Sequence, residues 1–167
     1  MTGGVLELRA IVYDHPDVAA LVAAVQQEYV HRYGGIDDTP VDPADFAPPH
    51  GFFVIGYLAG TPVACGGWRA RDGAGPPLRA GDAEIKRMFV VAAHRGRGRA
   101  RAVLAELERS AAAAGRRRVV LETGLRQPEA IALYVGAGYV PMPAFGIYRE
   151  SPNCRCFAKP LDRDRCV

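Results

Sequence analysis

Residues 83–114 read AEIKRMFVVAAHRGRGRARAVLAELERSAAAA, and the rest of the chain is organised around this stretch. Residues 83–91 alternate in the manner of a buried β-strand. A turn with two glycines follows, and an apolar stripe at helical spacing then predicts an amphipathic helix that Gly115 closes. Free backbone N–H groups and the helix dipole converge at such a helix N-terminus. We therefore predict a phosphate or pyrophosphate site at this turn.

The overall composition predicts an ordinary globular protein. The chain has 167 residues, so we expect a single domain over residues 1–167. Apolar residues make up 49% and charged residues 23%, which is typical of a folded domain. The sequence has neither an apolar run near the ~20 residues of a membrane helix nor the pattern of a signal peptide. We expect a cytoplasmic protein that does not enter a membrane.

Arginine dominates the positive charge. The net charge is +3, and of the 21 basic residues only Lys86 and Lys159 are lysines. A bias toward Ala, Gly, Pro and Arg explains this excess, whereas a polyanion partner would require the arginines to cluster. They cluster once, at the glycine turn (Arg95, Arg97, Arg99 and Arg101). Without a recognised nucleic-acid motif and with so small a net charge, we expect no nucleic-acid partner.

The four cysteines do not predict a metal site. Cys65, Cys154, Cys156 and Cys166 contain no Cys-x-x-Cys pair and no Cys/His set with zinc spacing. In a cytosolic protein such residues are free thiols. We therefore expect no metal and no catalysis by a cysteine nucleophile.

The remaining segments predict an α/β fold with a mixed sheet flanked by helices. Residues 36–50 hold four acids and four prolines, so they predict an irregular loop, either a solvated connection or an attractor for a cationic substrate. The predicted strands are residues 5–13, 51–57, 62–69, 83–91, 118–122, 139–140 and 155–159. The other predicted helices begin at Pro16 and Gln127 and end near Gly34 and Gly136.

Two familiar phosphate loops do not fit the glycine turn. A Walker loop is excluded, because no segment matches G-x-x-x-x-G-K-[ST]. A Rossmann turn would explain Gly96-x-Gly98 between a strand and a helix, with Glu122 ending the next strand. However, Arg101 stands where that motif needs a third small residue for close helix–strand packing. The turn also follows a β-hairpin and does not open a βαβ unit.

A third pattern matches the turn and its surroundings. Residues 95–100 (RGRGRA) fit [Q/R]-x-x-G-x-[G/A], and residues 127–139 (QPEAIALYVGAGY) are similar to N-x-x-A-x-x-x-Y-x-x-x-G-[FY]. In this order and spacing, residues 83–140 resemble the GNAT superfamily of acyl-CoA-dependent N-acyltransferases. The resemblance implies a mixed, mostly antiparallel sheet with a parallel, splayed strand pair. It also implies acetyl-CoA as co-substrate.

The resemblance assigns a set of coenzyme-binding residues. The N–H groups of Arg97 to Ala100 would bind the pyrophosphate, and hydrogen bonds to a charged group contribute about 1.5–3 kcal/mol each. Glycine at positions 96 and 98 would let the backbone approach the oxygens. The pantetheine arm would pair with the backbone of the preceding strand. The full predicted set is Met88, Phe89, Val90, Arg95, Gly96, Arg97, Gly98, Arg99, Ala100, Gln127 and Ala130.

Two residues are candidates for proton transfer. An alkylamine has a pKa near 10.4, so presenting it neutral at pH 7 costs about 4 kcal/mol. The family position of a catalytic glutamate is occupied by Glu84, a candidate base, although Glu84 could instead pair with a nearby arginine and shape the sheet. The family tyrosine that protonates the departing thiolate corresponds to Tyr134, whose alternative role is packing in the core.

The acceptor is left open by the sequence. The family implies a primary amine on a small molecule or peptide, and residues 29–33, 68–69 and 145–148 could wall its pocket. A non-catalytic acyl-CoA-binding regulatory module is the alternative function, because it would need the loop at residues 95–100 but neither Glu84 nor Tyr134. A homodimer is compatible with either function.

Overall fold

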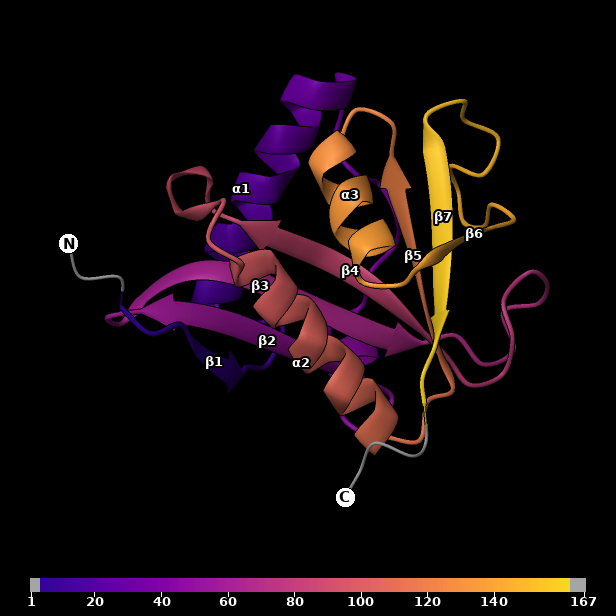
Figure 1. The fold of residues 1–167 in the computed structure, drawn as a ribbon, viewed down its shortest axis with the longest axis horizontal. Helices are drawn as coiled ribbons and strands as arrows, with labels where there is room; N and C mark the ends of the chain where they lie inside the picture. The colour runs from indigo at the N-terminus through magenta and orange to yellow at the C-terminus, as the bar shows by residue number, and fades with distance from the viewer. Residues whose placement is uncertain (1–3, 163–167) are drawn as a thin grey trace.

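In the computed structural model, which describes residues 4–162, seven strands form one sheet in the order β1-β2-β3-β4-β5-β7-β6 (Figure 1). The strands are β1 (Glu7–Ala10), β2 (Gly51–Leu58), β3 (Thr61–Ala70), β4 (Asp82–Val90), β5 (Arg118–Gly124), β6 (Val140–Met142) and β7 (Cys154–Pro160). The α-helices are α1 (Pro16–Tyr33), α2 (Arg99–Ala113) and α3 (Pro128–Gly136), with 3₁₀ turns at Pro43–Phe46 and Ala92–His94. The predicted order of strands and helices is confirmed.

The boundaries differ from the predictions mainly at the two edges of the sheet. β1 is shorter than the strand predicted over residues 5–13, because it pairs with β2 only from Glu7 to Ala10. Edge strand β6 begins at Val140 and pairs with β7 over three residues. In α1, Pro16 follows the N-cap His15, whose Nδ1 accepts the N–H of Asp17, and Gly34 ends the helix at φ +79°.

The helices cover both faces of the sheet. α2 and α3 lie on the near face in Figure 1, and α1 lies on the far face. Side chains alternate along the strands, so Val54 of β2 packs with Val103, Leu104 and Leu107 of α2. Its neighbours Phe53 and Ile55 pack with Val18 and Leu21 of α1. Two apolar cores therefore lie on opposite faces and fix the sheet between the helices.

The parallel pair β4–β5 is joined at one end only. Pairing covers Asp82–Glu84 against residues 118–120, and beyond it the two strands diverge, as Figure 1 shows. Arg118 holds the joined end through two hydrogen bonds to the Asp82 carboxylate, of 2.8 and 2.7 Å. This opening is the splayed pair that the resemblance implied.

Two smaller observations bear on the predictions. Among residues 4–162, none of the helices combines the length and hydropathy that crossing a bilayer requires. Cys65, Cys154 and Cys156 are free thiols, as predicted, while Cys166 lies outside the described residues.

Candidate functional site

A cavity of about 400 Å³ occupies the opening between β4 and β5. Because the strands separate after Glu84, residues 85–88 of β4 and residues 121–124 of β5 line the opening. Helix α1 contributes Tyr29 and Tyr33, and Tyr33 packs so closely on β5 that a Cβ at Gly124 would lie 2.0 Å from its hydroxyl oxygen. The strands and α3 contribute Ile85, Lys86, Arg87, Met88, Leu121, Glu122, Thr123, Gly124, Gln127, Ala130 and Tyr134.

The predicted coenzyme residues fall into two groups. Met88, Gln127 and Ala130 line this first cavity, so the central strand and the segment at residues 127–139 meet there. Phe89 and Val90 do not line it. The ring of Phe89 lies under the guanidinium of Arg95, 5.5 Å from its centroid, and Val90 is buried in the core with α2.

The glycine loop presents backbone donors. Gly96 and Gly98 both have φ +73°, a left-handed conformation that favours glycine, and a Cβ at either position would meet no atom within 4 Å. None of the N–H groups of residues 96–100 donates a backbone hydrogen bond within the described part of the chain. Gly98 is the N-cap of α2, so these donors lie at the positive end of the helix dipole. The loop is therefore built as an anion site.

The arginine side chains of this loop differ in what they contact. Arg95 folds back, donating to the Val90 carbonyl at 2.8 Å and pairing with Glu28 at 2.8 Å. Arg99 is buried and donates to the His94 carbonyl at 2.9 Å. Arg97 is exposed. Two of these three side chains thus hold the loop in shape, and the third is available to solvent.

A β-bulge in β4 changes the direction of the strand at the cavity. Cys65 pairs with Phe89 and Gly67 with Lys86, so Gly66 alone faces two residues, Arg87 and Met88. Arg87 takes φ +60°, which is rare for a residue with a side chain. A side chain at position 66 would collide with the Met88 side chain, 2.9 Å from its Cγ. The sequence analysis did not predict this bulge.

Tyr134 extends from α3 into the first cavity. Its side chain is buried, and its hydroxyl lies 3.7 Å from the Sδ of Met88. Its ring makes an edge contact with Tyr139. Burial raises the pKa of Tyr134 well above its usual value, so the phenol stays protonated at neutral pH and can donate.

A second cavity, of about 370 Å³, adjoins the first and shares Lys86 and Glu122 with it. Its other lining residues are Thr39, Pro40, Asp45, Arg69, Arg71, Glu84, Gly146 and Ile147. The two cavities therefore adjoin at Lys86 and Glu122. A donor and an acceptor bound in the two cavities would meet at Glu122.

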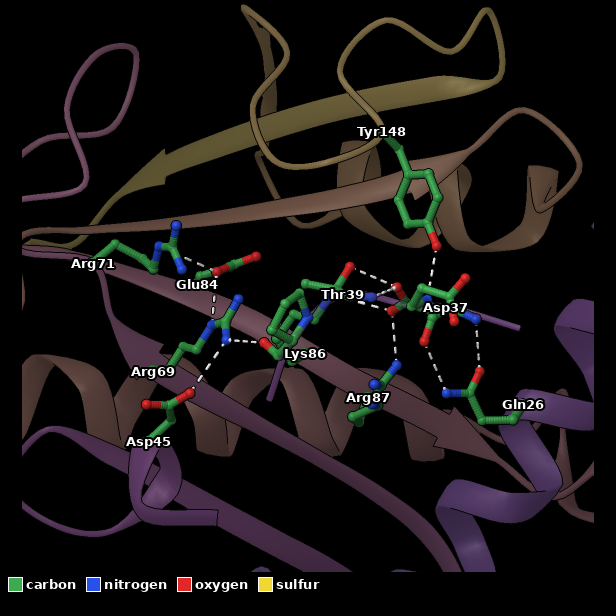
Figure 2. Close-up of polar contacts among 12 residues, drawn as sticks. Gln26, Asp37, Thr39, Asp45, Arg69, Arg71, Glu84, Lys86, Arg87 and Tyr148 are labelled. Atoms are coloured by element: carbon green, nitrogen blue, oxygen red, sulfur yellow. Dashed lines mark hydrogen bonds and ion pairs between the residues drawn. The ribbon is translucent and has the colours of Figure 1, made fainter. Parts of the chain in front are cut away.

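Glu84 lines the second cavity and is held by two arginines (Figure 2). Its Oε2 lies 3.0 Å from the Nε of Arg69 and 3.4 Å from the Nε of Arg71, and its side chain is only 5% exposed. Arg69 also donates to the Pro40 carbonyl at 2.8 Å and contacts Asp45 at 3.3 Å. Glu84 therefore belongs to a buried ionic cluster.

Glu122, which the sequence analysis noted only as the end of a strand, is the unpaired acid of the site. It lies on β5 opposite Cys156, and it makes no hydrogen bond or ion pair with any residue of the described chain. The pKa of Glu122 is raised to about 7, chiefly by burial and also by the nearby charges of Asp37 and Glu84, while Lys86 opposes the shift. A Cβ at Gly146 would lie 3.0 Å from its Oε2.

The acidic loop is fixed over the site by Asp37. Its Oδ2 lies 2.7 Å from a terminal nitrogen of Arg87 and 3.3 Å from the Nζ of Lys86, and its Oδ1 accepts from Thr39 (Figure 2). The next residue donates its N–H to the hydroxyl of Tyr148 at 2.8 Å. The charge of Asp37 is thus compensated inside the protein, and its pKa lies below the usual value despite burial because Lys86, Thr39 and Arg87 favour the carboxylate.

Known proteins are similar to this chain in sequence and in architecture. The model of the acetyltransferase (GNAT) family matches residues 18–139. An IAA acetyltransferase from Azospirillum brasilense is 37% identical over 121 residues, which are 72% of this chain and 75% of that protein.

Solved structures agree with the fold. A Klebsiella pneumoniae protein assigned to the acyl-CoA N-acyltransferases superposes with a TM-score of 0.77 at 27% identity, over 95% of this chain and 99% of that one. The yncA protein of Salmonella typhimurium, solved with acetyl-CoA, gives 0.69 at 18% identity over 95% of each chain. These matches confirm the resemblance and decide for an enzyme over a non-catalytic module. The chain belongs to the GNAT family and is an acetyltransferase.

Proposed function

We propose that this enzyme transfers an acetyl group from acetyl-CoA to a primary amine of a small molecule or peptide, by direct attack while both substrates are bound. One observation carries the proposal. The two cavities meet at Glu122, an unpaired carboxyl group whose pKa is raised to about 7. A group with this pKa can exchange a proton at neutral pH in either direction.

The residues around the first cavity suit the coenzyme. The free N–H groups of residues 96–100 would bind the pyrophosphate, and exposed Arg97 would add charge. Met88, Gln127 and Ala130 would contact the pantetheine arm in the opening between the strands. When bound, acetyl-CoA supplies the acetyl group as an activated thioester. The predicted backbone contacts of Phe89 and Val90, and the predicted contacts of Arg95 and Arg99, stay predictions.

Glu122 is our candidate for the general base. The acceptor amine must lose a proton before it attacks, and Glu122 lies where the two cavities join. Lys86 lines the same junction and keeps part of the Glu122 population ionised. The base role predicted for Glu84 remains a prediction, but its carboxylate already balances Arg69 and Arg71. Glu122 is the better supported of the two.

Tyr134 is our candidate for the general acid. A thiolate leaves more readily when a donor protonates or hydrogen-bonds it. The hydroxyl of Tyr134 is buried at the wall of the first cavity beside Met88 and stays protonated at neutral pH. It can therefore give its proton to the departing sulfur and regain one from solvent after the products leave.

A thiol-release assay tests the proposed reaction. The protein would be mixed with acetyl-CoA and a panel of amino acids, polyamines, amino sugars and short peptides, with mass spectrometry of the acceptor; IAA joins the panel because a relative is named for it. We expect at least one amine to yield stoichiometric thiol and an acetylated product. Thiol release without any acetylated amine would contradict direct transfer.

A further inference from the structure

We propose that the second cavity binds an anionic group of the acceptor through Arg71, so that the substrate is a small amine that also carries a carboxylate, as an α-amino acid does. This inference rests on the proposed acetyl transfer to an amine and adds the chemical class of that amine. It depends on which cationic groups of the cavity already have partners and which do not.

Three cationic side chains line the second cavity, and two of them are occupied. Lys86 pairs with Asp37 at 3.3 Å. Arg69 is almost fully buried, and its contacts with Glu84, the Pro40 carbonyl and Asp45 use donors on both Nε and a terminal nitrogen. Neither side chain needs a ligand to balance its charge.

Arg71 is different. Its Nε lies 3.4 Å from the Oε2 of Glu84, a carboxylate oxygen that Arg69 already binds at 3.0 Å. The Nε is buried and makes no hydrogen bond, and its two terminal amino groups have no partner among residues 4–162. The side chain is 27% exposed, so a solute can reach it while part of its hydration is already lost. Arg71 therefore offers this cavity both of its terminal amino groups as donors without a partner among residues 4–162.

A guanidinium group selects for a planar anion. Its donors form a rigid fork that matches both oxygens of a carboxylate, which makes such pairs short and directional. The Oε2 of Glu84 contacts both Arg69 and Arg71, and it reaches only the Nε of Arg71. The terminal amino groups of the Arg71 guanidinium are left for another anion. An incoming carboxylate would complete the fork, and the cost of the unsatisfied donors would be relieved on binding.

Glu122, on the wall of the same cavity, suits the amine. Glu122 stands at the junction with the first cavity, and Arg71 and Glu122 line the same 370 Å³ space. A molecule with an amine near Glu122 and a carboxylate near Arg71 matches both residues. A polyamine would instead bring a second ammonium group toward Arg69, Arg71 and Lys86, and a neutral amide would leave the fork of Arg71 unfilled.

The test compares amino acids with their α-amides, in which a neutral group of similar shape replaces the carboxylate. We expect wild-type kcat/KM to favour the acids about 10- to 100-fold, the range of one charged hydrogen bond. Arg71→Gln should bring this ratio close to one through KM, and Arg71→Lys should leave an intermediate ratio. Arg116→Gln is the matched control, because Arg116 also binds a carboxylate, that of Asp72, but lines neither cavity.

The ratio is insensitive to partial unfolding, which would lower both rates together. An acid-to-amide ratio unchanged in Arg71→Gln, or a wild-type enzyme that prefers amides or diamines, overturns the proposed subsite. Calorimetric titration of acids and amides into protein saturated with CoA gives the same comparison without turnover. If no acceptor releases thiol, the proposed transfer fails, while this binding preference still supports or overturns the Arg71 subsite.

Discussion

The Oε2 of Glu84 lies 3.0 Å from the Nε of Arg69, and both side chains are buried. The Glu84 carboxylate is therefore engaged in ion pairs inside the protein, with Arg69 and with Arg71. Glu122, which lines the same cavity, has no such partner among residues 4–162. The two acids are neighbours with different surroundings, and these surroundings predict different roles.

Glu84→Gln should act mainly on stability. The change leaves Arg69 and Arg71 without the charge that balances them, and breaking a buried pair in this way costs about 3–5 kcal/mol, less where Gln keeps a hydrogen bond. We expect urea unfolding to show a loss of about 2–4 kcal/mol. In the folded variant the inflection in kcat/KM should persist and move to slightly lower pH, because the Glu84 charge is one of the causes that raise the pKa of Glu122. Loss of that pH dependence with stability intact would return the base role to Glu84.

Glu122→Gln should make the protein more stable than the wild type at pH values where Glu122 is ionised. Folding raises the pKa of Glu122 from 4.5 to about 7, so the folded state binds the proton more tightly than the unfolded state. Wild-type stability should therefore be highest below pH 4.5 as far as this group is concerned, and fall as the pH rises toward 7. The full shift corresponds to about 3 kcal/mol.

The measurement is the free energy of unfolding of both proteins at pH 5 and pH 8. From pH 5 to pH 8, the free energy of unfolding of Glu122→Gln should increase relative to that of the wild type by up to about 3 kcal/mol. Apart from position 122 the two proteins carry the same titratable groups, so the difference between them isolates the ionisation of Glu122 together with its coupling to neighbouring charges. If the free energy of unfolding changed equally with pH in the two proteins, ionisation of Glu122 would not destabilise the folded state, and the raised pKa would be contradicted.

Glu122 also shows where prediction from the sequence ended. The strand at residues 83–91, the glycine loop and the helix with Tyr134 follow from periodicity, glycine spacing and the family motif, and the fold bears them out. That β5 leaves β4 after Glu84 depends on tertiary packing, so the exposure of Glu122 to both cavities could not be read locally. The Arg69–Glu84 pair likewise depends on the β3–β4 register across a loop of eleven residues, from Arg71 to Gly81.

Tyr134→Phe should lower kcat about 10- to 1,000-fold with little change in acetyl-CoA affinity, because only the proton donor is removed. The ring remains to pack against Tyr139. The control is Tyr139→Phe, which removes a hydroxyl bonded to Glu108 and absent from the cavity lining. Equal turnover of Tyr134→Phe and wild type would remove Tyr134 from the chemistry.

Gly98→Asp should abolish acetyl-CoA binding while the fold persists. The residue lies at φ +73° in the loop of free N–H groups, and an added carboxylate would repel the pyrophosphate. Gly115→Asp is the matched control, since Gly115 has φ +79°, equally open surroundings and a place at the other end of α2. Calorimetry should show binding in the control alone. Undiminished affinity in Gly98→Asp would move the pyrophosphate to another site.

The most direct test is the pH dependence of kcat/KM for wild type and Glu122→Gln, measured with the amine that gives the fastest thiol release. We predict that the wild-type rate rises through an inflection near pH 7, where Glu122 loses its proton. Glu122→Gln should lack this inflection and be slower by about 100- to 10,000-fold above it. A variant that keeps the wild-type rate and inflection would contradict the assignment of Glu122 as the base.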